Sequence, residues 1–287
     1  LTLASCSKFE GDQTIPASIQ IDSIAVKVTS SAQGTASHRI TDAWVYVEGQ
    51  LIGAFELPAK FPVLMKGKKK LLIRPGIRID GMVEQRSYYP LYGQIEQNIL
   101  LAEDSVSKPS GTLTAGENVL FVPYREGVQY VWAETFEDEN FAIDTTSKSQ
   151  ASFELTETSS PETFEGLHSG RILLTPTDTI FEALSTEAIN LPRKGSPVFL
   201  EINYRNTNSF TLGLISVSST QVIQQPILTL NPSATWNKLY LNLTPNASAA
   251  ELGVKFKLFV AALLDDGKTE GEILIDNMKW VYINQSE

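Results

Sequence analysis

Cysteine is almost absent from this chain. Of 287 residues only Cys6 is a cysteine, so no disulfide can form within the chain. The fold must therefore be stabilised by packing or by a bound ion. Histidine is nearly as rare, with His38 and His168 as the two examples. The sequence accordingly has no Cys/His set with the spacing of a zinc site.

The chain also lacks a long apolar run and an excess of basic residues. Its longest apolar stretch, residues 256–264, is interrupted by Lys257, whereas a membrane-spanning helix needs roughly 20 apolar residues. The 33 acidic residues exceed the 23 basic ones, and the formal net charge is −10. Because such a protein repels nucleic-acid phosphates and anionic lipid headgroups, we predict no nucleic-acid partner and no membrane contact except through a covalent lipid.

Motifs for common enzyme chemistry are missing as well. The sequence has no Gly-x-Ser-x-Gly nucleophile elbow, no Gly-x-x-x-x-Gly-Lys-Ser/Thr phosphate loop and no dinucleotide fingerprint. A pair of carboxylates for glycoside cleavage cannot be recognised in sequence, because only their separation in space is diagnostic. We therefore predict no catalytic residues and a protein that is not an enzyme, and we keep a hydrolase as the remaining enzymatic alternative.

The N-terminal residues carry a different signal. Leu3, Ala4, Ser5 and Cys6 form an apolar–small–small–Cys tetrad, which resembles the lipobox of bacterial lipoproteins. The resemblance implies that Cys6 is the lipid-attachment residue, that the residues before it are the end of a signal peptide, and that residues 1–14 make up lipobox and tether. The scattered acids after Cys6 resemble the surface-export signal of Bacteroidetes lipoproteins, although an ordinary polar linker is the alternative. We expect a lipid-anchored protein of the bacterial outer membrane or cell surface.

From residue 15 onward, apolar and polar residues alternate. Residues 19–28, 119–132 and much of 198–283 show the period of two that is typical of β-strands, with Gly-rich turns between them. No stretch has helical periodicity over more than a few turns, and only residues 94–101 leave helix and strand both open. The pattern predicts an all-β protein built from β-sandwiches.

The first unit is expected over residues 15–134. Residues 40–53 look like a hairpin, followed by Glu56, Leu57 and Pro58 and by a Gly-containing turn into residues 66–73. This succession resembles the small sandwiches of the PEGA and carboxypeptidase-regulatory type in exported bacterial proteins. The resemblance implies an immunoglobulin-like sandwich that acts as a spacer or docking module.

The second unit is expected over residues 135–287. Its opening at residues 136–138, its strand at 233–243 and its closing run at 273–281 resemble, in this order, the galactose-binding-like jelly roll of many carbohydrate-binding modules. The resemblance implies a jelly-roll β-sandwich that binds glycan. It also implies one structural calcium ion, with Glu137 or Asp138 and Asp276 as donors, although Asp276 could equally end a strand or face water.

A glycan site requires planar polar groups for hydroxyls and aromatic faces for sugar rings. Strand alternation places a polar set opposite the expected core of the second unit, and if the strands share one sheet, these residues form an open face. The candidate glycan-binding residues are Glu201, Asn203, Arg205, Lys238, Tyr240, Asn242 and Lys257. Any solvated sheet face has the same composition, which is the competing interpretation.

These observations predict a non-catalytic envelope lipoprotein whose jelly roll binds a polysaccharide. The alternative is a structural or adhesive envelope protein that docks another protein, for example through a sheet edge. A groove with an aromatic beside a carboxylate or amide would favour glycan, and a flat apolar patch would favour protein docking.

Overall fold

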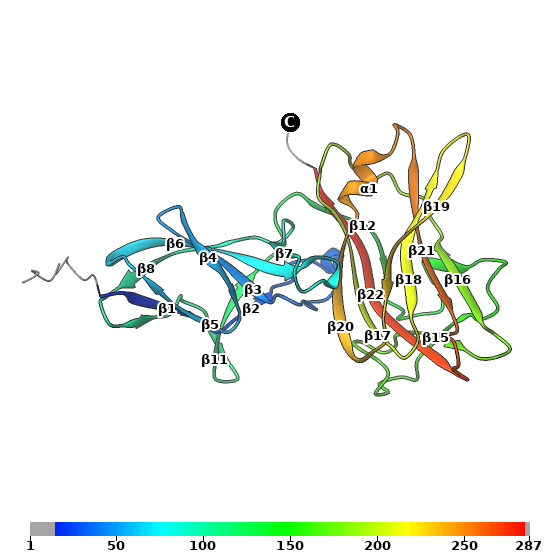
Figure 1. The fold of residues 1–287 in the computed structure, drawn as a ribbon, viewed down its shortest axis with the longest axis horizontal. Coiled ribbons are helices and arrows are strands. Elements are labelled where there is room, and N and C mark those ends of the chain that lie inside the picture. Colours follow the sequence, from blue (N-terminus) through cyan, green and yellow to red (C-terminus); the bar gives the residue numbers. More distant parts are fainter. Residues whose placement is uncertain (1–14, 285–287) are drawn as a thin grey trace, which may run out of the picture.

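The computed structural model describes residues 15–284. It is an all-β protein of two sandwiches, an immunoglobulin-like one followed by a jelly roll, which lie end to end (Figure 1). Helical structure in this part of the chain is limited to the 3₁₀ turns η1 (Ser31–Gln33) and η2 (Ile79–Gly81) and to the six-residue helix α1 (Thr244–Ala249). Among the described helices, none has the length and hydropathy to span a membrane.

The first sandwich contains eleven strands in three sheets. Their orders are β5-β1-β9, β10-β11-β2 and β4-β3-β6-β7, with β8 also paired to β6. The strands are β1 (Ala17–Ile21), β2 (Ser23–Val26), β3 (Asp42–Val47), β4 (Gln50–Glu56), β5 (Ala59–Val63), β6 (Gly67–Arg78), β7 (Arg86–Tyr88), β8 (Ile95–Leu101), β9 (Val106–Ser107), β10 (Thr112–Thr114) and β11 (Glu117–Val122). The ambiguous residues 94–101 are thus a strand.

A single residue, Asp22, separates β1 from β2, and these two strands belong to different sheets. Ile19 and Ile21 on β1 and Ile24 on β2 are buried in one core. The buried positions are two residues apart within β1 but three residues apart across Asp22. β1 pairs with β5 and β9, whereas β2 pairs in parallel with β11. The extra residue turns the apolar side chains inward again after the switch.

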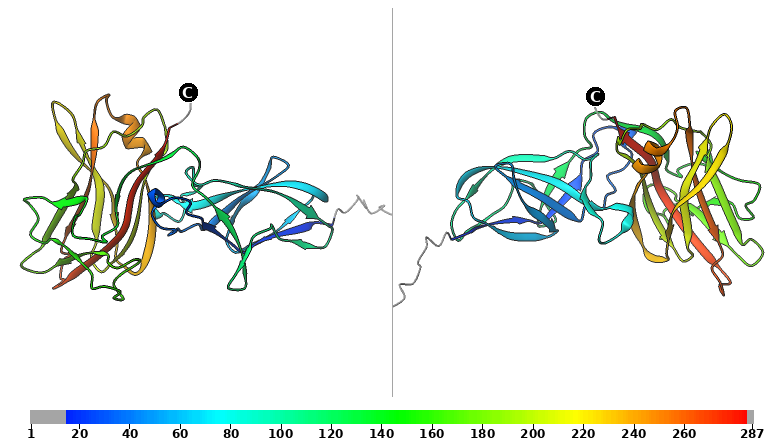
Figure 2. Two further views of the ribbon diagram at one scale, coloured as in Figure 1. Left: turned by 180° about the vertical axis from the view of Figure 1, so that it is seen from behind. Right: turned by 45° about the horizontal axis from the view of Figure 1, so that its top comes forward.

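The second sandwich has eleven strands and two sheets. The proximal sheet, next to the first sandwich, has the order β14-β15-β22-β17-β20, with β12 also paired to β22. The distal sheet has the order β13-β16-β21-β18-β19 and lies on the far side (Figures 1 and 2). The strands are β12 (Val128–Glu134), β13 (Ile143–Thr145), β14 (Phe153–Leu155), β15 (Gly170–Leu174), β16 (Ile180–Ser185), β17 (Val198–Asn206), β18 (Phe210–Val217), β19 (Val222–Leu230), β20 (Ser233–Asn242), β21 (Lys255–Leu263) and β22 (Gly271–Ile283).

Strand β12 belongs to the second sandwich, although the sequence led us to expect that the first unit extends to residue 134. It pairs antiparallel with β22, and Trp132 is buried in the jelly-roll core beside Trp280, with the two ring centroids 6.3 Å apart. Alternation continues almost without a break from β11 into β12, so the sequence pattern does not show the transition between the two sandwiches.

Candidate functional site

The polar face predicted for glycan forms on the proximal sheet, but it is covered. β17 pairs with β20, as assumed, and brings Glu201, Asn203, Lys238 and Tyr240 onto one face. Their exposed fractions are only 0%, 2%, 6% and 1%, because the first sandwich packs on this face (Figures 1 and 2). The expectation of an open face is therefore wrong.

Glu201 lies at the centre of this interface, in what we term the junction cluster: Glu201, Lys238, Lys279, Tyr89 and Tyr124. Its Oε1 accepts hydrogen bonds from the hydroxyls of Tyr89 at 2.8 Å and Tyr124 at 2.9 Å. Its Oε2 lies 3.3 Å from Lys238 Nζ and 3.5 Å from Lys279 Nζ. One buried carboxylate thus joins both sandwiches.

Burial and charge act in opposite directions on the junction cluster. Burial raises the pKa of Glu201, but the charges of Lys279 and Lys238 and the tyrosine hydroxyls outweigh it, so the pKa of Glu201 lies below its ordinary value. For Lys238, burial outweighs the attraction of Glu201 and lowers the pKa to about 8. Glu201 is therefore ionised at neutral pH.

Further bonds around the junction cluster cross the same interface. The Tyr240 hydroxyl lies 3.0 Å from the Tyr92 hydroxyl and accepts a 2.9 Å hydrogen bond from the Arg39 backbone N–H. Asn203 accepts a 2.9 Å bond from Ser37 Oγ. These partners occupy the groups that a sugar would have used, so Tyr240 and Asn203 hold the two sandwiches together.

The other three candidates do not complete a common site. Arg205 stacks on Trp236, with 5.9 Å between guanidinium carbon and ring centroid. Asn242 donates its backbone N–H to Asp80 at 2.7 Å. Lys257 belongs to β21 in the distal sheet. The seven predicted residues are therefore spread over both sheets, because the assumption that β21 shares a sheet with β17 and β20 was wrong.

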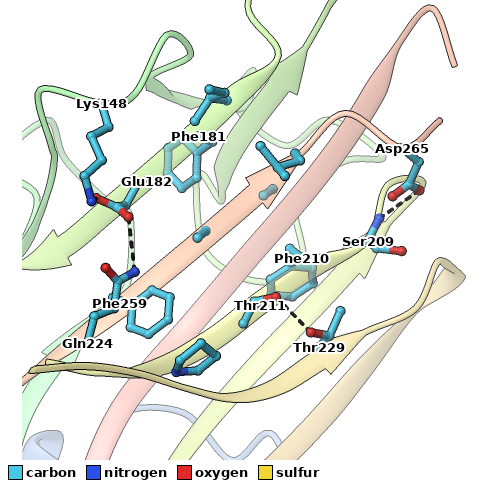
Figure 3. Close-up of a pocket in the computed structure, with 15 residues that line it drawn as sticks. Lys148, Phe181, Glu182, Ser209, Phe210, Thr211, Gln224, Thr229, Phe259 and Asp265 are labelled. Carbon is cyan, nitrogen blue, oxygen red and sulfur yellow. Dashed lines mark hydrogen bonds and ion pairs between the residues drawn. The ribbon is translucent and has the colours of Figure 1, made fainter.

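The distal sheet, which faces away from the first sandwich, contains a groove of about 430 Å³ (Figure 3). One row of residues crosses its floor, with Glu182 on β16, Ala261 on β21 and Thr211 on β18 in register, and Thr229 on β19 next to Thr211. The Thr211 and Thr229 hydroxyls lie 2.9 Å apart. Small side chains in the middle of this row leave the space that forms the groove.

Phe259 lines the groove beside this row, and a glycine makes room for its ring. A Cβ atom built at Gly213 would lie 2.2 Å from Phe259 Cε1 and 2.4 Å from the Gln225 carbonyl oxygen. No other residue could therefore replace Gly213 without displacing the ring. Phe259 is itself only 1% exposed. Its ring therefore contributes apolar surface to the groove wall but has no free face on which a sugar ring could stack.

Polar side chains rim the groove. Gln224 Nε2 donates to Glu182 Oε2 at 3.2 Å, and Lys148 Nζ lies 3.3 Å from Glu182 Oε1 (Figure 3). Strands β16 and β19 are separated by two others, which would put them about 14 Å apart in a flat sheet. The contact between their side chains shows that the sheet is concave here.

The two carboxylates of the groove, Glu182 and Asp265, are both ionised. Burial raises the pKa of Glu182, but hydrogen bonds from Thr146, Gln224 and Lys148 outweigh it and leave the pKa below its ordinary value. Likewise, the Lys268 ion pair and the Ser209 backbone N–H outweigh burial and lower the pKa of Asp265. A glycosidase needs one carboxyl with a raised pKa as its general acid, and neither residue provides it.

The sequence contained part of the signal for this groove. Alternation on β21 places Lys257, Phe259 and Ala261 opposite the core, and Gly213 lies inside the mostly apolar strand β18. A glycine inside a strand indicates a close approach by another group. Which strands are neighbours, and how the sheet curves, could not be read from these residues.

The predicted calcium ligands are brought together only in part. Asp276 is buried and accepts a 2.7 Å hydrogen bond from Ser169 Oγ. Burial, with a contribution from the charge of Glu137, raises the pKa of Asp276 to about 7. The Asp138 carboxylate bonds within its own loop instead, to the Asn140 backbone N–H at 2.7 Å. Residues 15–284 contain no cluster of three or more Asp, Glu, His or Cys side chains suited to a metal. The predicted set, Glu137 or Asp138 with Asp276, would need other oxygen donors to complete it, and the calcium ion stays a prediction.

The predicted lipid-attachment residue, Cys6, lies outside the described residues. Its role stays a prediction.

No family model and no curated protein matches this sequence. Solved structures do match. One is a xylan-binding domain of carbohydrate-binding module family 22, with 17% identity over 55% of this chain and 97% of that one, at a TM-score of 0.38. A second is the family 11 module from Clostridium thermocellum in complex with a β-1,3-1,4-mixed-linked tetrasaccharide, with 9% identity over 56% and 98%, at 0.37. A third is a CBM29-2 mutant complexed with mannohexaose, with 11% identity over 54% and 91%, at 0.34.

Proposed function

We propose that this protein is a non-catalytic glycan-binding protein and that the distal-sheet groove is its site. The observation that carries the proposal is a groove on the sheet left free by the first sandwich. The small side chains of Ala261 and Thr211 lie beside the Phe259 ring in it, and a carboxylate, an amide and hydroxyls surround them. Saccharides present apolar C–H faces and many hydroxyls, and they are bound by convergent planar polar groups around apolar surface. Glu182 and Gln224 are such groups.

Filling the groove tests this proposal. The side chain of Ala261→Trp would occupy the floor between Glu182 and Thr211, and we expect binding on a glycan array to fall by roughly tenfold or more, since the loss of a few polar contacts exceeds 1.4 kcal/mol. Leu252→Trp is the matched control, because Leu252 is 95% exposed outside the groove. Its binding should equal that of the parent.

Two results would contradict the groove as a glycan site. One is unchanged binding by Ala261→Trp. The other is a blank array with folded parent protein, which would favour the alternative of an envelope protein that docks another protein. A pull-down from envelope extracts would then test that alternative.

We also propose that one calcium ion binds beside Asp276 and Glu137, completed by backbone carbonyls. Supporting this is a buried Asp276 carboxylate with no Lys or Arg within ion-pair distance in residues 15–284, and oxygen donors are what calcium prefers. At a concentration about 100-fold above its Kd, calcium would stabilise the fold by about 2.7 kcal/mol.

Chelator should therefore lower the melting temperature by several degrees, and Asp276→Asn should abolish the response. Asp138→Asn is the matched control and should respond like the parent, because Asp138 bonds within its own loop. A melting temperature that changes with neither calcium nor chelator would contradict the proposed calcium site.

We propose, finally, that Cys6 carries a lipid that anchors the protein to the bacterial outer membrane or cell surface. The support is the Leu3-Ala4-Ser5-Cys6 tetrad. Metabolic labelling with a fatty acid should mark the protein in its bacterial host, and Cys6→Ser should prevent it. Label retained by Cys6→Ser would contradict the anchor.

A further inference from the structure

Arg74 occupies an unusual position on the outer face of the first sandwich. It lies in the middle of β6, and its guanidinium carbon is 5.0 Å from the ring centroid of Tyr88 and 5.4 Å from that of Tyr46. Tyr88 comes from β7 and Tyr46 from β3, the two neighbours of β6 in this part of the sheet. Aromatic contacts on both flanks restrict where the guanidinium can go.

The hydrogen-bonding capacity of Arg74 is nevertheless unused. Within residues 15–284, each other arginine donates at least one side-chain hydrogen bond, namely Arg39, Arg78, Arg86, Arg125, Arg171, Arg193 and Arg205. The guanidinium of Arg74 has neither a hydrogen bond nor a carboxylate within ion-pair distance in the same part of the chain. Five N–H donors are thus held in place without an acceptor.

A pocket of about 350 Å³ lies beside this guanidinium. We call it the arginine pocket, and its lining includes Arg74, Arg125, Tyr88 and Gln94 but no acidic residue. Arg125 donates one bond, to the Pro90 carbonyl oxygen at 3.1 Å, and has four donors left. In a chain of net charge −10, the pocket lining carries two positive charges and no negative one. The nearby Glu96 carboxylate is engaged by Gln94 Nε2 at 2.6 Å and by Lys70 Nζ at 3.5 Å.

We infer that the arginine pocket binds the carboxylate of an acidic saccharide, such as a single uronate residue on an otherwise neutral glycan. A planar guanidinium presents two parallel N–H groups to a carboxylate, which makes the pair directional as well as strong. The Tyr88 side chain, 38% exposed, offers aromatic surface to the sugar ring. Gln94 donates its Nε2 to Glu96 at 2.6 Å, which leaves its Oε1 to accept a hydrogen bond from a hydroxyl. The overall negative charge disfavours a polyanion and leaves an isolated acid as the suitable ligand.

This second site does not depend on the groove. The arginine pocket is lined by residues of the first sandwich, among them Arg74 and Tyr88, whereas the groove lies on the distal sheet of the second (Figure 3). Failure of either proposal therefore leaves the other intact.

Calorimetry with a trisaccharide that ends in one uronate residue tests the inference. The intact protein should bind it, and should bind the analogue whose carboxyl is reduced to hydroxymethyl at least about tenfold more weakly. Arg74→Ala should lose binding by a similar factor. Arg74→Lys keeps the charge but lacks the fork of donors, and we expect it to lose most of the affinity as well.

Arg78→Ala is the matched control, because Arg78 lies on the same strand and face but is paired with Glu56 at 3.0 Å. Its affinity should equal that of the parent. Equal affinity for the acidic and the reduced trisaccharide would overturn the inference, as would undiminished binding by folded Arg74→Lys. Binding of a sulfated trisaccharide in place of the uronate one would overturn the choice of carboxylate.

Discussion

Replacing Glu201 with alanine is expected to lower the free energy of unfolding by about 3–5 kcal/mol. The variant leaves the ammonium groups of Lys238 and Lys279 buried without the carboxylate that lies 3.3 Å and 3.5 Å from them. It also leaves the hydroxyls of Tyr89 and Tyr124 without their shared acceptor. Urea denaturation of the parent and the variant measures the difference.

Two further variants identify the source of that loss. Glu201→Gln keeps an acceptor for the tyrosines but removes the charge, so we expect a loss of the same order, dominated by the two lysines. Glu103→Ala removes an exposed carboxylate 3.3 Å from Lys66, and we expect less than about 1 kcal/mol. If Glu201→Ala behaved like Glu103→Ala, the junction cluster would not hold the sandwiches together.

The junction cluster also shows what the sequence could and could not predict. Alternation correctly placed Val198, Leu200 and Ile202 in the core and Glu201 and Asn203 on the opposite face, because a period of two follows from strand geometry alone. Whether that opposite face meets water or another domain depends on contacts between residues more than a hundred positions apart, such as Tyr89 with Glu201. Nothing local in β17 records them.

The groove shows the same limit for a binding site. The residue types were visible, with Phe259 and Ala261 on one side of a strand and Gly213 inside another. The concavity arises only when β16, β21, β18 and β19 lie in that order, so that Glu182 and Gln224 meet across two strands. Strand order in a sandwich is set by its connections and not by the pattern within each strand. The all-β class was therefore predictable, and the site was not.

Alkaline pH should destabilise the protein steeply. Burial raises the pKa values of Tyr89, Tyr92, Tyr124 and Tyr240, whereas tyrosines in the unfolded chain ionise near pH 10. Above about pH 10 the folded state therefore holds more protons than the unfolded state, and stability falls as pH rises, by about 1.4 kcal/mol per pH unit for each tyrosine. These four groups together contribute roughly 5.5 kcal/mol per pH unit, and the raised pKa values of Tyr130 and Tyr204 steepen the slope further.

At lower pH, Lys238 has the opposite effect on the pH dependence of stability, because its pKa is lowered by folding and not raised. Its pKa is lowered to about 8, so between about pH 8 and 10 the unfolded chain holds the extra proton and stability rises with pH. We therefore expect the free energy of unfolding, measured by urea denaturation at a series of pH values, to pass through a maximum near pH 10.

Two substitutions separate the contributions to this profile. Tyr92→Phe removes one of these protons and should reduce the alkaline slope by about 1.4 kcal/mol per pH unit. Lys238→Met should abolish the rise below the maximum and leave the alkaline slope unchanged. The tyrosinate absorbance of the buried interface tyrosines should appear together with unfolding, because ionising Tyr89 or Tyr124 would place a second negative charge 2.8 Å or 2.9 Å from Glu201. Tyrosinate that forms fully before unfolding would show that the interface opens first and that the two sandwiches separate before either loses its own core.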